Sequence, residues 1–147
     1  MNSVKIAPSV LQVELHPELT QKKLIEYCRI NGIQMTAFSS LGSSSYVELE
    51  GATLRESLFE SSIIKRLSQK YEKSATQILL RWAVQQGIAV IPKTVKVERL
   101  KENGNIFEWN LTKEEMKEVD SLDKGKRYND PGFFCKNAFG KFFPIYD

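Results

Sequence analysis

Residues 10–17 read VLQVELHP, a short apolar-rich run that His16 and Pro17 close. Proline has no N–H to donate and its ring blocks helix continuation, so the run predicts a β-strand ending at Leu15. The same kind of segment returns at 33–38 (IQMTAF) and at 88–91 (IAVI), where Pro92 ends the run. Because the three segments are apolar on both alternating faces, they predict strands buried on both sides of a sheet.

Helical patterns fill the intervals between these strands. We expect a helix capped by Thr20 and ending at Asn31-Gly32, then two helices after the second strand, the later one beginning with a capping box at 74–77. A helix over about 97–103 and a last one capped by Thr112 follow. The side chains expected on their buried faces are Leu24, Ile25, Cys28, Ile63, Ile64, Leu67, Tyr71, Ile78, Leu79, Trp82, Ala83, Met116, Val119 and Leu122.

The alternation of strands and helices predicts an α/β fold with a parallel sheet and crossover helices. Buried parallel strands followed by polar loops are typical of a (β/α)8 barrel, whose active site lies at those loops. A barrel closes with eight strands, whereas three are visible here. We therefore expect an incomplete barrel with two open strand edges, through which the chain self-associates, and with Val13, Met35, Ala37 and Val90 pointing inward.

Composition excludes several classes of function. The chain has 147 residues, of which 41% are hydrophobic and 27% charged, as in one globular domain. It has no run of about 18 apolar residues and no apolar signal-peptide core, so we expect a cytoplasmic protein with no membrane partner. The net charge of +3 is interspersed, which argues against nucleic acid. Cys28 and Cys135 have neither zinc nor disulfide spacing, so we expect reduced thiols and no metal site.

Three separated motifs, in this order and spacing, resemble the C-terminal part of an aldo-keto reductase. They are 10–17 (VLQVELHP), 36–43 (TAFSSLGS) and 91–103, which begins IPKTV and continues through Glu98-Arg99 to Glu102-Asn103. The tail, with RYNDP at 127–131 and FPIYD at 143–147, is most similar to fungal-type reductases of sugars and small aldehydes.

The resemblance extends over residues 5–147 and implies a partial (β/α)8 TIM barrel. It would consist of the last three strand-helix units and the C-terminal helix over 10–126, followed by a tail over 127–147 that resembles the family's substrate loop. In that tail, Phe133, Phe134 and Phe139 would be walls of a substrate pocket.

The family binds NADP(H), and the resemblance assigns this role to ten residues. Gln12, at the end of its strand, would hold the nicotinamide carboxamide, since a side-chain amide both donates and accepts hydrogen bonds. Phe38 would stack on the nicotinamide ring. The pyrophosphate would lie against the backbone N–H groups and hydroxyls of Ser39, Leu41 and Ser43. Taken singly, these residues are equally consistent with a strand-end amide, a core phenylalanine and a serine-rich turn.

The remaining five residues would hold the adenosine end. In the family, the positions of Lys93, Thr94 and Arg99 bind the 2′-phosphate of NADP, and those of Glu102 and Asn103 bind the adenine edge. The residues themselves favour a phosphate site, because two cations and a hydroxyl gather near one helix N-terminus. An isolated Lys/Arg pair is more often a solvated basic face.

Two positions depart from the family pattern. Ser40 replaces a frequent proline, and Leu11 replaces a frequent asparagine. Neither change breaks the motifs. The single histidine, His16, stands at a position that the family's reaction does not use, so we assign it a structural role.

The family transfers a hydride from NADPH to an aldehyde or ketone. Its tyrosine acid, the lysine-aspartate pair that tunes it and a histidine all belong to the N-terminal part of the barrel, as does a Ser-Asn pair that holds the carboxamide. The tyrosines of this sequence do not match that motif: Tyr27, Tyr46, Tyr71, Tyr128 and Tyr146. We therefore expect the chain alone not to be catalytically competent.

Three interpretations remain open. The chain is a portion of an NADPH-dependent reductase of carbonyl or sugar substrates, completed by an N-terminal part. Alternatively it is a non-catalytic, nucleotide-responsive or regulatory module, or an interaction fragment without a ligand.

Overall fold

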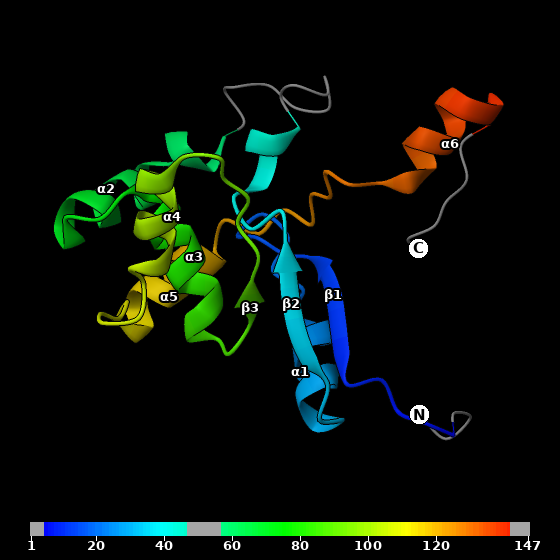
Figure 1. The fold of residues 1–147 in the computed structure, drawn as a ribbon, viewed down its shortest axis with the longest axis horizontal. Helices are drawn as coiled ribbons and strands as arrows, with labels where there is room; N and C mark the ends of the chain where they lie inside the picture. The colour runs from blue at the N-terminus through cyan, green and yellow to red at the C-terminus, as the bar shows by residue number, and fades with distance from the viewer. Residues whose placement is uncertain (1–4, 47–56, 142–147) are drawn as a thin grey trace.

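The computed structural model describes residues 5–46 and 57–141 and contains a three-stranded parallel sheet (Figure 1). The strands are β1 (Val10–Glu14), β2 (Gln34–Phe38) and β3 (Ala89–Val90), and they lie side by side in the order β1-β2-β3. Both pairs are parallel, which confirms the predicted α/β organisation. Strand β3 is shorter than the predicted 88–91 segment because Pro92 follows so closely.

Helices lie between and after the strands, and all of them except the last follow the predicted order. They are α1 (Lys22–Ile30) between β1 and β2, α2 (Ser62–Tyr71) and α3 (Ala75–Gln85) between β2 and β3, and α4 (Val97–Gly104), α5 (Lys113–Asp120) and α6 (Pro131–Phe139) after β3. Two 3₁₀ turns, η1 (Gly42–Ser45) and η3 (Leu58–Glu60), lie between β2 and α2. None of the described helices is long and apolar enough to cross a membrane.

The sheet presents one face to the helices. Met35 and Ala37 of β2 are buried in the same core as Cys28 of α1 and Trp82 of α3, and Val13 and Val90 pack against that core. The prediction that Val13, Met35, Ala37 and Val90 point into a barrel interior is therefore wrong, because these side chains face the helices. The opposite face carries Val10, Gln12, Thr36, Phe38 and Ala89.

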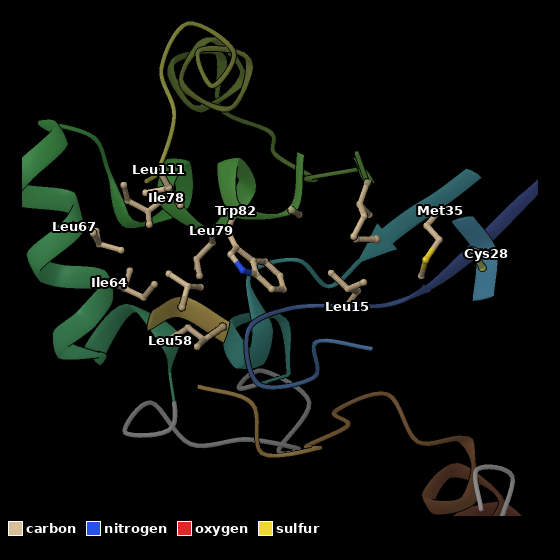
Figure 2. Close-up of a cluster of buried hydrophobic side chains, with 14 of the residues drawn as sticks. Leu15, Cys28, Met35, Leu58, Ile64, Leu67, Ile78, Leu79, Trp82 and Leu111 are labelled. Atoms are coloured by element: carbon tan, nitrogen blue, oxygen red, sulfur yellow. The ribbon is translucent and has the colours of Figure 1, made fainter. Parts of the chain in front are cut away.

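Trp82 lies near the centre of the hydrophobic core (Figure 2). Met35 and Cys28 form one end of the labelled cluster, whereas Ile64 and Leu67 of α2 lie toward the other. The Trp82 side chain is fully buried, and its Nε1 donates to Asp120 Oδ1 over 2.9 Å. This bond fixes the C-terminal end of α5 on α3.

Side-chain caps mark the start of three of the six described α-helices: α3, α5 and α6. Both predicted capping boxes are present, Ser74 with Gln77 at α3 and Thr112 with Glu115 at α5. The predicted cap at Thr20 is wrong. Gln21 is the N-cap of α1, and the Thr20 hydroxyl instead donates to the carboxylate of Asp123, which lies far along the chain.

The tail forms a helix as well as a loop. Over 131–139, α6 begins with Asp130 accepting from the Gly132 N–H over 2.8 Å and with Pro131 in the first turn, and it ends at Gly140 in a left-handed conformation. Figure 1 shows α6 extending away from α2–α5. The loop predicted for this segment is therefore wrong over 131–139, where Asp130, Pro131 and Gly140 were the available signals for a helix. The predicted FPIYD ending and Tyr146 lie outside the described residues.

Candidate functional site

The two predicted nicotinamide-binding residues share one face of the sheet. Gln12 pairs with Thr36, and Glu14 pairs with Phe38, so Gln12 and Phe38 both lie on the face away from the helices. Gln12 is exposed and Phe38 is half-buried. Gln12 occupies the middle of β1, which corrects its predicted location at the strand end.

The loop that follows β2 brings the predicted pyrophosphate-binding residues together. Ser39 adopts a left-handed backbone conformation with φ 52°, and its carbonyl accepts from the Gly42 N–H over 2.8 Å. The Leu41 side chain packs against the hydrophobic core, and Ser43 is fully buried. Gly42 has φ 69°, and a Cβ there would lie 2.8 Å from Leu58 Cδ1. A glycine is therefore required at that position.

The predicted phosphate-binding residues surround the start of α4. Lys93 and Thr94 follow β3, and Arg99 lies in the first turn of α4. Thr94 Oγ1 accepts from the Lys96 N–H over 3.1 Å, which orders the entry to the helix. The Lys93 and Arg99 side chains are exposed, and no acidic side chain among the described residues pairs with either. Two cations are thus available to an anion beside a helix N-terminus.

Glu102 and Asn103 lie in the last turn of α4 and are half-buried. The Glu102 carboxylate accepts from the Ser74 hydroxyl, and its carbonyl accepts from Gln77 Nε2 over 3.2 Å. Glu102 therefore also links α4 to the N-terminus of α3. The predicted adenine-binding role of these two residues stays a prediction.

A buried polar network, which the sequence analysis missed, lies just beyond β1. Glu14 is 1% exposed, and its carboxylate accepts from the N–H groups of Tyr128 and Asn129 over 2.8 and 3.0 Å. Glu18 accepts from Tyr128 Oη over 2.6 Å and from Lys124 Nζ over 2.7 Å. These contacts attach the segment 124–129 to the end of β1. In the sequence, this network was signalled by Glu14, His16 and Glu18, three polar residues that alternate with apolar ones.

His16 completes this network. Its ring is fully buried, with Nε2 located 3.0 Å from Glu14 Oε1 and the ring centroid 5.4 Å from that of Tyr128. Burial alone raises the pKa of the Glu14 carboxyl, but the hydrogen bonds from His16 and from the two backbone N–H groups outweigh burial and lower it. Glu14 is thus held as an anion, and the geometry supports a structural role for His16.

Tyr46 links this network to the loop after β2. The ring is 8% exposed and stacks on Tyr128, with centroids 5.7 Å apart and an interplanar angle of 16°. Its hydroxyl lies 2.8 Å from Ser39 Oγ. Burial raises the pKa of Tyr46, so the hydroxyl keeps its proton at neutral pH.

Other candidate sites are weaker. A cavity of about 280 Å³ borders Glu18, Leu58 and Lys124, and none of the predicted cofactor residues lines it. Among the described residues, no group of three or more His, Cys, Asp or Glu side chains could hold a metal ion. Phe133 and Phe134 belong to α6, and Phe139 is 74% exposed. Their role as pocket walls stays a prediction.

Comparison with known proteins identifies the family. The model of the aldo/keto reductase family matches residues 1–124, and the chain therefore belongs to that family. A probable NAD(P)H-dependent D-xylose reductase of Aspergillus flavus is 46% identical over 144 residues, covering 97% of this chain and 44% of the relative. The NADPH-dependent aldose reductase of Saccharomyces cerevisiae is 43% identical over 146 residues, covering 97% of this chain and 45% of the relative.

Solved structures agree with this assignment. A crystal structure of an aldo-keto reductase complexed with NADPH matches with a TM-score of 0.81 and 29% identity, covering 99% of this chain and 45% of that chain. An aldo-keto reductase from a deep-sea metagenome library matches with a TM-score of 0.75 and 33% identity, covering 86% of this chain and 43% of that chain. The chain thus spans less than half the length of the relatives it matches.

Proposed function

We propose that the chain is the NADP(H)-binding part of an aldo-keto reductase that reduces aldehydes or ketones to alcohols. In this proposal, residues 10–126 are the last three strand-helix units and the final helix of a (β/α)8 barrel, and 127–147 form a tail beside the substrate. Sugars and small aldehydes are the proposed substrates, since relatives bear the names D-xylose reductase and aldose reductase.

One observation carries the proposal. Gln12 and Phe38 share a face of the sheet, while the Ser39–Ser43 loop and the Lys93-Thr94 segment follow neighbouring parallel strands. The C-terminal ends of parallel strands meet at one edge, which is where α/β barrels bind their ligands. These groups together suit a dinucleotide that carries an extra phosphate: an amide, an aromatic face, a tight loop and two exposed cations.

Each group has a distinct task in this scheme. The amide of Gln12 orients the nicotinamide by donating to and accepting from its carboxamide, while the Phe38 ring covers one face of it. The backbone N–H groups of Ser39, Leu41 and Ser43, with the hydroxyls of the two serines, surround the pyrophosphate. Lys93, Thr94 and Arg99 hold the 2′-phosphate, and Glu102 and Asn103 contact the adenine. When bound, NADPH supplies the hydride.

The proton that completes carbonyl reduction would come from another part of the barrel. The family's tyrosine acid and its lysine, aspartate and histidine partners have no matching motif in this sequence. A positioned general acid typically contributes 10²–10⁴-fold to the rate. We therefore propose that the chain binds the cofactor but needs an N-terminal barrel part for turnover.

Titration of the purified chain with NADPH and NADH, followed by cofactor fluorescence and calorimetry, tests the proposal. We expect saturable binding with NADPH preferred. Absence of binding to either cofactor would contradict it and would favour an interaction fragment without a ligand. Turnover is tested by adding the N-terminal part of the yeast aldose reductase, the region for which this chain has no counterpart. Binding without any gain in turnover would favour a nucleotide-responsive module.

A further inference from the structure

Ser39 holds an uncommon backbone conformation at the first position of the proposed pyrophosphate loop. Its φ of 52° lies in the left-handed region, which costs a residue with a Cβ free energy and persists only where neighbouring groups enforce it. This conformation sets the direction of the backbone immediately after Phe38. The carbonyl of Ser39 also closes the turn by accepting from Gly42 N–H over 2.8 Å.

Tyr46, farther along the same loop, contacts Ser39. Its hydroxyl lies 2.8 Å from Ser39 Oγ, and its backbone N–H donates to the Ser43 carbonyl over 2.8 Å. Ser39 and Tyr46 therefore join the two ends of a loop that contains Leu41 and Ser43.

Tyr46 is itself held from outside the loop. Its ring stacks on Tyr128. Tyr128 Oη donates to the buried Glu18 carboxylate over 2.6 Å. The loop after β2 is thus anchored to the segment after α5, and the anchor is itself buried.

We propose that Tyr46 is a positioning residue for the cofactor: its hydroxyl holds Ser39 in the conformation that directs the loop's N–H groups at the dinucleotide pyrophosphate. This inference rests on the proposed function. A loop already closed before binding loses less conformational freedom when it binds, which increases affinity. Tyr46 touches neither the nicotinamide nor the 2′-phosphate in this scheme, so its effect should be confined to the pyrophosphate.

Tyr46→Phe removes the hydroxyl and keeps the ring that stacks on Tyr128, and Tyr27→Phe, at a half-exposed position on α1, is the matched control. Binding is measured with two ligands: NADPH and adenosine 2′-monophosphate, which has the 2′-phosphate and adenine but no phosphate at the 5′ position, where the pyrophosphate of NADPH is attached. We expect Tyr46→Phe to raise the Kd for NADPH about fivefold and that for the monophosphate less than about twofold, since one hydrogen bond is lost. Equal weakening of both ligands, or of neither, would overturn the inference.

Hydrogen exchange of the Gly42 amide, measured without ligand, provides a second readout. Tyr46→Phe should accelerate this exchange about fivefold while amides of α3 remain unchanged. Unchanged Gly42 exchange would also overturn the inference. If the parent chain binds neither ligand, the proposed function fails and the cofactor role of Tyr46 fails with it. If the parent binds and Tyr46→Phe binds equally well, only the role of Tyr46 is refuted.

Discussion

The Nζ atom of Lys70, near the end of α2, lies 2.6 Å from Oε1 of Glu115 in the first turn of α5. The same carboxylate accepts from Tyr71 Oη over 2.5 Å and from the Thr112 N–H over 2.8 Å. Burial raises the pKa of Glu115, but the hydrogen bonds from Lys70, Tyr71 and Thr112 outweigh it and lower the pKa from 4.5 to about 2. One carboxylate thus caps α5 and attaches it to α2.

The free energy of unfolding should therefore fall in acid, partly because the Glu115 carboxylate becomes protonated. Because its pKa is lower in the folded chain, its contribution to the free energy of unfolding is fully present above about pH 5 and is lost as the pH falls toward 2. Glu115→Gln should cost about 1–2 kcal/mol in urea unfolding at pH 7, and the difference from the parent should shrink below pH 5. The control is Glu118→Gln, also on α5, which removes an exposed ion pair between Glu118 and Arg66 of α2. This change should lower the free energy of unfolding by less than about 0.5 kcal/mol.

Gly42→Ala should destabilise the loop after β2. Its φ of 69° is unfavourable for alanine, and the new Cβ would lie 2.8 Å from Leu58 Cδ1. We expect a loss of about 1–3 kcal/mol in the free energy of unfolding, measured by chemical denaturation. Gly104→Ala is the matched change, because Gly104 has an ordinary φ and open space around it. That variant should be neutral or slightly stabilising, and similar losses in both variants would contradict the argument.

Removing a cation at the start of α4 should alter cofactor preference. Arg99→Ala and Lys93→Ala should each weaken NADPH binding about tenfold and leave NADH nearly unaffected, because NADH has no 2′-phosphate. Lys101→Ala, on the same helix but outside the proposed site, should change neither affinity. Equal titration curves for the two cofactors in the parent and in Arg99→Ala would remove the basis for the phosphate assignment.

The purified 147-residue chain should not oxidise NADPH measurably with small aldehydes or aldoses, as followed by absorbance of the reduced cofactor. The reason is the proposal that the general acid comes from an N-terminal barrel part, and a positioned acid contributes typically 10²–10⁴-fold to the rate. Turnover that survives replacement of all five tyrosines by phenylalanine would show that another chemistry operates.

The chain on its own should self-associate. Val10 is 58% exposed on the sheet face away from the helices, and Ile91, Val97 and Leu100 are 53%, 64% and 65% exposed beside β3 and along α4. At about 25 cal/mol per Å², covering even ~400 Å² of such surface is worth roughly 10 kcal/mol. Light scattering should give a mass above that of a monomer. A monomer with a sharp melt and no binding of a hydrophobic dye would contradict the prediction.

Local signals predicted much of the fold. Pro17 and Pro92 end the first and third strands because proline lacks an N–H, and the capping boxes at Ser74 and Thr112 lie within one helical turn. Gly32 and Gly87, with φ of 66° and 78°, end α1 and α3 for the same local reason. The three motifs that resemble the family's, at 10–17, 36–43 and 91–103, could also be recognised in the sequence, because each is short and their order and spacing are kept.

The sequence by itself determined the order of the three strands and of helices α1 to α5, since each depends on neighbours a few positions away. The residues proposed to bind the cofactor came from short motifs that resemble the family's. Only the tertiary structure decided that Met35 and Ala37 meet the helices, because both faces of a parallel strand are normally covered and the local sequence does not say on which side the helices lie. It likewise decided that Thr20 bonds Asp123, and that Glu14 accepts from the backbone of Tyr128. Those partners are more than one hundred residues apart, and their meeting depends on how the helices and tail pack against the sheet.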